Sequence, residues 1–138
     1  MDRQQLVRAA REAAKHAYAP YSKFRVGAAV VVKTPEGPRV VAGANVENAS
    51  YGLTLCAERN AMASACMLAG AGELPTITHV AVSCIDAKKD ATAASRVPCG
   101  ACRQWLAELA PDAVYYIDGV PGGFHLCDLL PNAFELGR

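Results

Sequence analysis

The sequence predicts an α/β fold in which a mixed central sheet is covered by helices on both faces. Segments with the apolar spacing of helices alternate with β-branched segments, in the order α-β-β-α-β-α-β. A short turn separates the first two β segments, which favours an antiparallel hairpin. Helices separate the later β segments, which favours parallel pairing through crossover connections.

The N-terminal helix is predicted over residues 2–18, where apolar side chains recur at helical spacing. Asp2 is the predicted N-cap, Gln5 stands three residues later as in a capping box, and Pro20 ends the segment. Two strands follow around the turn "TPEGP", at residues 25–33 and 39–45.

The remaining elements follow without a repeat, linker or low-complexity segment, so one domain is predicted over residues 1–138. A second helix is predicted from Cys56 to Gly70, and a third begins at Gly100 and is stopped by Pro111. The other segments are a strand at 77–84, a polar loop at 86–98, a strand at 113–118, a turn at 119–123, a short strand and the terminal "LCDLLPNAF".

Composition excludes several classes of function. The net charge is +1, so no basic excess exists to bind nucleic acid through its phosphates. No apolar run approaches the length of a membrane span, and the charged N-terminus lacks the apolar region of a secretion signal. We therefore expect a cytoplasmic protein. In such a chain, six cysteines indicate metal binding or catalysis before disulfides.

Two cysteine groups suggest a metal site. Cys99 and Cys102 form a C-x-x-C at the start of the third helix, and Cys56 opens the second helix two residues before Glu58. Three thiolates with one open position are typical of a catalytic zinc, whereas a structural zinc needs four protein ligands. Cys66 lies ten residues after Cys56, about 15 Å along a helix, and cannot share the ion. The sequence leaves four other side chains open as ligands: Cys84, Cys127, His79 and His125.

The predicted surroundings of these thiols are positive. Both cysteine groups stand at helix N-termini, where the helix dipole supplies about half a positive charge and favours thiolates. Arg59, one turn from Cys56, is expected to balance thiolate charge and to donate a hydrogen bond to sulfur.

Five motifs together resemble the homotetrameric zinc-dependent cytidine deaminases, over nearly the whole chain. They are "YAPYSKFRVGAA", "NVENASYG", "CAERNA", "PCGACRQ" and "LLPNAF", in that order. Zinc deaminases carry H-x-E followed by P-C-x-x-C; here the first ligand is cysteine, as in the homotetrameric enzymes. The resemblance implies a three-layer α/β/α cytidine deaminase-like fold. It also implies deamination of cytidine and deoxycytidine in pyrimidine salvage.

The resemblance assigns roles to individual residues. Cys56, Cys99 and Cys102 would hold one Zn²⁺ per subunit, and Glu58 would be the general acid and base that moves protons between water and the cytosine ring. The implied substrate contacts are Asn45 and Glu47 to the ribose 3′-hydroxyl, Phe24 packed on the base, and Ala57. Tyr51 and Phe134 would be donated to a neighbouring subunit's pocket, so that a homotetramer shares its active sites. The implied partner is a small nucleoside, with no nucleic acid and no membrane.

Alternatives remain on the sequence alone. Another deaminase of this fold, such as the blasticidin S type, would use the same zinc group and glutamate on a larger nucleoside. A tRNA- or DNA-editing enzyme is disfavoured by the cysteine ligand and the lack of basic excess. A non-catalytic zinc-stabilised module is disfavoured by Glu58. Three further cysteines, Cys66, Cys84 and Cys127, are expected to be buried thiols, and the loop before Pro98 is somewhat long.

Overall fold

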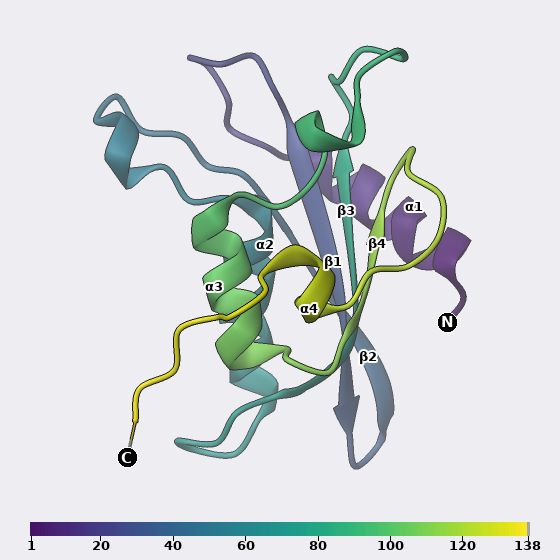
Figure 1. Cartoon of the computed structure of the whole chain (residues 1–138), viewed down its shortest axis with the longest axis vertical. Helices are drawn as coiled ribbons and strands as arrows, with labels where there is room; N and C mark the ends of the chain where they lie inside the picture. The colour runs from purple at the N-terminus through teal and green to yellow at the C-terminus, as the bar shows by residue number, and fades with distance from the viewer. Residues whose placement is uncertain (138) are drawn as a thin grey trace.

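The computed structural model describes residues 1–137, and a four-stranded mixed sheet forms its centre (Figure 1). The strand order is β2-β1-β3-β4, with β1 antiparallel to both neighbours and β3 parallel to β4. The strands are β1 (Val26–Thr34), β2 (Gly37–Ala44), β3 (Thr76–Cys84) and β4 (Val114–Ile117). The helices are α1 (Arg3–Ala14), α2 (Ala57–Ala65), α3 (Gly100–Leu109) and α4 (Leu126–Leu129). The predicted hairpin and mixed sheet are confirmed.

Helices cover both faces of the sheet, and each face has its own core. On one face, Leu6, Val7 and Ala10 of α1 pack against alternate residues of β1 and β3. On the other face, α2, α3 and α4 pack on the remaining alternate residues of β1, including Val30 and Val32. Figure 1 shows α1 on one side of the strands and α2 and α3 on the other. Because β1 is buried on both faces, its sequence is almost continuously apolar.

Two glycines let helices lie directly on the sheet. A Cβ on Gly27 would stand 1.9 Å from the backbone oxygen of Ala10 in α1. A Cβ on Gly43 of β2 would stand 2.6 Å from the backbone nitrogen of Ala61 in α2. Any side chain at Gly43 would therefore displace α2, the helix that begins directly after Cys56.

The first helix begins as predicted and ends earlier than predicted. Asp2 and Gln5 form the capping box, with the backbone N–H of Gln5 donating to the Asp2 carboxylate at 2.8 Å. The helix ends at Ala14, not beside Pro20. The reason is tertiary, because Tyr18 pairs with Val46 in a parallel bridge and so draws the chain out of the helix.

The later elements differ from prediction at their ends. The second helix is α-helical only to Ala65, followed by a 3₁₀ turn at Cys66–Leu68, whereas α3 ends before Pro111 as predicted. The predicted short strand after β4 is a single bridge between Phe124 and Tyr115, and α4 follows it unpredicted.

The prediction that three further cysteines are buried is wrong. Cys127 is exposed, because α4 is a short helix that buries only Leu129, and Cys66 and Cys84 are half-buried. Within residues 1–137, no helix has the length and apolar character needed to cross a membrane.

Candidate metal centre and active site

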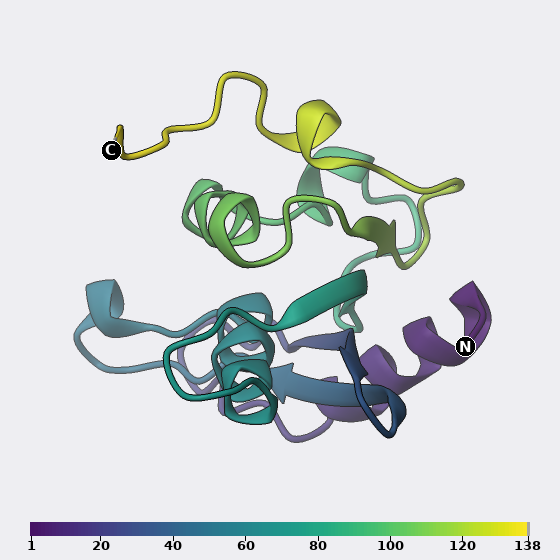
Figure 2. The same ribbon diagram turned by 90° about the horizontal axis from the view of Figure 1, so that it is seen from below.

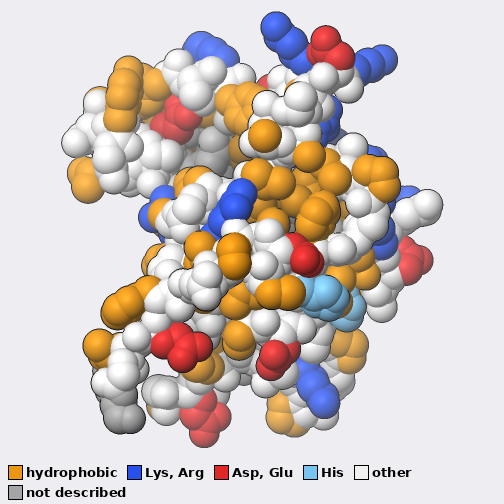
Figure 3. Space-filling model, in the orientation of Figure 1, with side chains coloured by type: hydrophobic (Ala, Val, Ile, Leu, Met, Phe, Trp, Pro, Cys, Tyr) orange, Lys and Arg blue, Asp and Glu red, His pale blue; other side chains and the backbone are white. Residues whose placement is uncertain are grey.

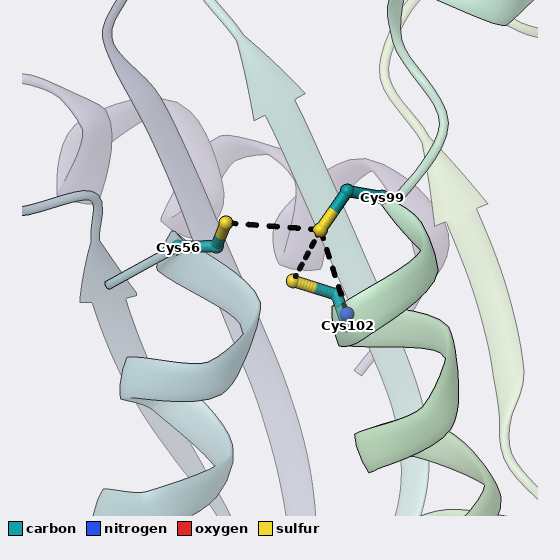
Figure 4. A group of neighbouring side chains, drawn as sticks. All are labelled: Cys56, Cys99 and Cys102. Atoms are coloured by element: carbon teal, nitrogen blue, oxygen red, sulfur yellow. Dashed lines mark hydrogen bonds between the residues drawn. The ribbon is translucent and has the colours of Figure 1, made fainter. Parts of the chain in front are cut away.

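Three thiols converge at the adjoining ends of α2 and α3 (Figure 4). The Sγ atoms of Cys56, Cys99 and Cys102 all lie within 4.8 Å of one another. Cys99 Sγ is 3.8 Å from Cys56 Sγ and 3.4 Å from Cys102 Sγ. Sulfurs about 2.3 Å from a tetrahedral zinc lie about 3.8 Å apart, so the thiol spacing fits that ion.

Helix starts place these thiols. Cys56 is the N-cap of α2, and Cys99 is the N-cap of α3, where its sulfur accepts a hydrogen bond from the backbone nitrogen of Cys102. Because both helices pack on the same face of the sheet, their N-termini meet. Positive ends of two helix dipoles therefore surround the thiols and stabilise thiolates.

The thiol group is chemically suited to a catalytic metal ion. Thiolates are preferred ligands of zinc, and three of them leave a fourth tetrahedral position for water or substrate. Among the described residues, the group contains these three cysteines, and the four side chains left open by the sequence (Cys84, Cys127, His79 and His125) are not members.

The environment stabilises negative charge on Cys56. The neighbouring Cys102 thiol and then the Arg59 guanidinium, 3.4 Å from the sulfur, together lower the pKa of Cys56 to about 5. The same contact with Cys56 raises the pKa of Cys102. Arg59 also donates to the backbone oxygen of Thr54 at 3.3 Å, which holds the guanidinium against the sulfur.

Glu58 is buried beside the thiols. It lies in the first turn of α2 and is 4% exposed. Burial raises the pKa of its carboxyl group, and the negative charge of Cys56 raises it further. A raised pKa brings a carboxyl group closer to the pH at which the protein works, which favours its use as a general acid and base.

Glu58 and two of the thiols line one cavity of about 180 Å³. Three of the predicted substrate-contact residues line it too: Phe24, Asn45 and Ala57. The buried Asn45 side chain donates to the backbone oxygen of Phe24 at 2.9 Å and accepts from the backbone nitrogen of Val26 at 2.8 Å. Asn45 therefore holds the segment that carries Phe24 against the cavity.

Glu47 and Tyr51 line a neighbouring cavity of about 380 Å³. The Glu47 carboxylate accepts hydrogen bonds from the backbone nitrogens of Tyr21 and Ser22 and from the Ser22 hydroxyl. These bonds, the Ser22 hydroxyl first, lower the pKa of Glu47. Thr54 lines both cavities, so the two hollows adjoin.

Phe134 lies away from both of these cavities. Its side chain is 69% exposed on the segment after α4, which runs outside α3 (Figure 2). Together with Trp105 of α3, it lines a separate open groove of about 800 Å³. Within one chain, therefore, Phe134 does not reach the cavity of Glu58.

Sequence reasoning missed several residues that line the Glu58 cavity. Thr54 lies two residues before Cys56, and its only sequence signal is that proximity. The end of β3 contributes Val82 and Cys84, and burial raises the pKa of the Cys84 thiol to about 11. The loop before Pro98 forms one wall of the cavity with residues Ser95, Arg96 and Val97. The length of the loop alone did not predict this contact with the cavity.

Comparison with known proteins finds consistent similarities. Residues 1–118 match the model of the cytidine and deoxycytidylate deaminase zinc-binding region. The cytidine deaminase of Halalkalibacterium halodurans is 44% identical over 138 residues, which cover 97% of this chain and 95% of that protein. The cytidine deaminase of Mycobacterium tuberculosis is 45% identical over 127 residues, covering 92% of this chain and 85% of that protein.

A solved structure is also similar throughout its length. The crystal structure of cytidine deaminase from Burkholderia pseudomallei has a TM-score of 0.80 and 41% sequence identity to this chain. The alignment covers 97% of this chain and 100% of that one.

Proposed function

The chain belongs to the cytidine and deoxycytidylate deaminase family, and we propose that it is a zinc-dependent enzyme that hydrolyses cytidine and deoxycytidine to uridine, deoxyuridine and ammonia. One observation carries this proposal. A buried carboxyl group with a raised pKa, that of Glu58, lines the same cavity as the thiols of Cys56 and Cys99. Hydrolytic deamination requires a metal site and a proton carrier side by side.

In the proposed reaction the three thiols bind the metal ion and Glu58 transfers protons. Cys56, Cys99 and Cys102 would hold zinc, which supplies a Lewis acid that lowers the pKa of water in its open position. Glu58 accepts a proton from that water and donates it to N3 of the cytosine ring. The water oxygen would form a bond to C4, and Glu58 would carry its second proton to the amino group, which leaves C4 as ammonia. Arg59 offsets the negative charge of the thiolates through its contact with Cys56.

The walls of the two adjoining cavities would hold the nucleoside. Phe24 packs on the base, with Ala57 close to it in the Glu58 cavity. Asn45 and Glu47 would receive the ribose 3′-hydroxyl, Asn45 from the Glu58 cavity and Glu47 from the cavity beside it. Contact at the 3′-hydroxyl leaves the 2′ position weakly recognised, which explains why both ribose and deoxyribose nucleosides are proposed as substrates.

We propose that the enzyme is a homotetramer with shared active sites, in the cytoplasm. Tyr51 is 74% exposed and Phe134 is 69% exposed, which leaves two aromatic side chains for a neighbouring subunit. Their segments project on the same side of the molecule in Figure 1, where the space-filling view shows apolar side chains on both (Figure 3). Aromatic side chains such as these are enriched in interfaces between protein chains. Sedimentation of the zinc-loaded protein would measure the number of subunits.

The test of the activity follows the loss of cytidine's ultraviolet absorbance with zinc-loaded protein. Wild type should convert cytidine to uridine, and Glu58→Gln should retain zinc and lose more than nine-tenths of the rate, because general acid and base groups contribute about 10²–10⁴-fold. Glu12→Gln is the matched control, since Glu12 lies on the exposed side of α1 and, among residues 1–137, forms an ion pair with Lys15 alone. A Glu58→Gln rate above a tenth of wild type would contradict the role of Glu58. No conversion by zinc-loaded wild type would contradict cytidine as substrate, and blasticidin S would be tried next.

A further inference from the structure

The loop at residues 85–98, between β3 and α3, supplies one wall of the Glu58 cavity. Ser95, Arg96 and Val97 line the cavity, and the buried Pro98 follows them directly before Cys99. Nearer the other end of the loop, Lys88 and the two residues after it are exposed to solvent. The shape of the cavity therefore depends on how this loop is held.

The Arg96 side chain fastens the loop at two points. Its Nη2 donates to the backbone oxygen of Lys88 at 2.8 Å, within the loop. Its Nη1 donates to the backbone oxygen of Asp118 at 3.5 Å, in the turn after β4. Its Nε is buried and has no hydrogen-bond partner among the described residues. The guanidinium thus ties two segments that lie 30 residues apart in the chain.

The turn that receives Arg96 is itself firmly held. The backbone nitrogen of Asp118 donates to the backbone oxygen of Val82, a cavity residue, at 2.9 Å. Gly119 leaves the space that the guanidinium occupies, since a Cβ there would stand 2.6 Å from Arg96 Nη1. The loop is therefore tied to a fixed part of the sheet.

We propose that Arg96 is a positioning residue that holds Ser95–Val97 against the cavity, through its contacts with Lys88 and with the Asp118–Gly119 turn, and so sets the affinity for the nucleoside. This inference rests on the proposed function. Without these hydrogen bonds, Ser95–Val97 lie against the cavity in only a fraction of the molecules, and only these molecules bind the nucleoside well. The apparent affinity is then reduced in proportion to that fraction. The proton transfers of Glu58 do not involve Arg96, so kcat changes little.

Arg96→Ala is compared with Arg3→Ala. Arg3 binds the same turn, donating to the backbone oxygens of Ile117 and Val120, and its Nε is also buried without a partner in the described structure. We expect Arg96→Ala to raise the KM for cytidine about tenfold with kcat within about twofold, and Arg3→Ala to leave KM unchanged. An unchanged KM in Arg96→Ala, or equal increases in both variants, would overturn the proposal.

Substitutions at two glycines test the contact between Arg96 and the turn after β4 without replacing Arg96 itself. Gly119 and Gly122 have φ values of +85° and +84°, so alanine strains the backbone equally at both. A Cβ at Gly122 meets nothing within 4 Å, whereas a Cβ at Gly119 meets the guanidinium. Gly119→Ala should raise KM as Arg96→Ala does, and Gly122→Ala should not. Equal effects on KM would overturn the role of Arg96 and leave turn strain as the cause.

Trypsin provides a test that needs no substrate. Lys88 and Lys89 are exposed in the loop, and the rate of cleavage after them reports how firmly the loop is held. Arg96→Ala should be cut there several times faster than wild type and Arg3→Ala. Equal cleavage would overturn the proposed tie. If the wild-type protein does not deaminate cytidine, the proposed function is overturned. The role of Arg96 in holding the loop is still tested by the trypsin cleavage rates.

Discussion

Arg59 and Cys56 lie one helical turn apart, and the Nη2 of Arg59 donates to the Cys56 sulfur at 3.4 Å. The arrangement places a full positive charge against a thiol whose pKa is lowered to about 5. It is local in origin, because side chains three residues apart at a helix start share one face. The consequence is a thiolate that is ready to bind metal at neutral pH.

Replacing Arg59 should therefore weaken metal retention. In Arg59→Gln, the thiolate loses a charge-assisted hydrogen bond, worth about 1.5–3 kcal/mol, so zinc affinity should fall by about tenfold or more. Competition with a chromophoric chelator measures this affinity. Arg8→Gln, on the exposed side of α1, is the control and should match wild type. Equal zinc affinity in Arg59→Gln and wild type would contradict the charge-balancing role.

Removal of zinc should abolish activity before it unfolds the protein. Neither apolar core cluster includes any of the three thiols, of which only Cys102 is fully buried, so the sheet and helices should retain their packing when the ion leaves. Titration with a chelator should eliminate deamination while the far-ultraviolet circular dichroism remains native. Unfolding in step with the loss of activity would instead indicate a structural metal site.

Gly27 and Gly43 should have different functional effects although both support a helix. Alanine at either position forces a helix from the sheet, which typically costs about 1–3 kcal/mol or more, so both variants should have a lower Tm. Only Gly43→Ala displaces α2, the helix that follows Cys56, so it should also weaken zinc retention. Gly27→Ala, which displaces α1 on the opposite face, should retain zinc as wild type does. Equal zinc loss in both variants would show a general effect of destabilisation.

Asp118 should make stability depend on acid pH. Its carboxylate accepts from Arg11 Nε at 2.7 Å and from the buried Ser83 hydroxyl at 2.7 Å. The Arg11 contact, followed by Ser83, lowers the pKa of Asp118 below its usual 3.8. A carboxyl group with a lower pKa in the folded state stabilises the fold above pH 3.8, and this contribution is lost as pH falls through the folded-state pKa.

Asp118→Asn should accordingly lower the free energy of unfolding by about 1–2 kcal/mol at pH 7, because it weakens hydrogen bonds at a partly buried site. The difference from wild type should shrink as pH falls below 3.8. Urea unfolding at pH 7 and pH 3 measures it, with Glu36→Gln, at an exposed carboxyl group in the hairpin turn, as the control. A difference that stays constant between the two pH values would contradict the linkage.

Local signals predicted much of the fold. Asp2 and Gln5 form the predicted capping box, and the hairpin lies where the turn residues placed it. Errors arose where distant contacts decide the structure. The first helix ends early because Tyr18 pairs with Val46, and the strand predicted near Phe124 shrinks to one bridge with Tyr115. Neither bridge could be predicted from the residues of the helix or strand whose length it changes, because the partner residue lies in another segment.

The sequence by itself determined the chemistry of the site. Cys56, Glu58 and Arg59 are related within one helical turn, as are Cys99 and Cys102, and such spacings follow from helix geometry alone. The tertiary structure decided how these groups combine. Cys56 and Cys99 are 43 residues apart in the chain and meet at 3.8 Å because α2 and α3 pack on the same sheet face. The wall that carries Arg96 likewise depends on a distant turn, since hydrogen bonds between remote segments form only when packing has brought those segments together.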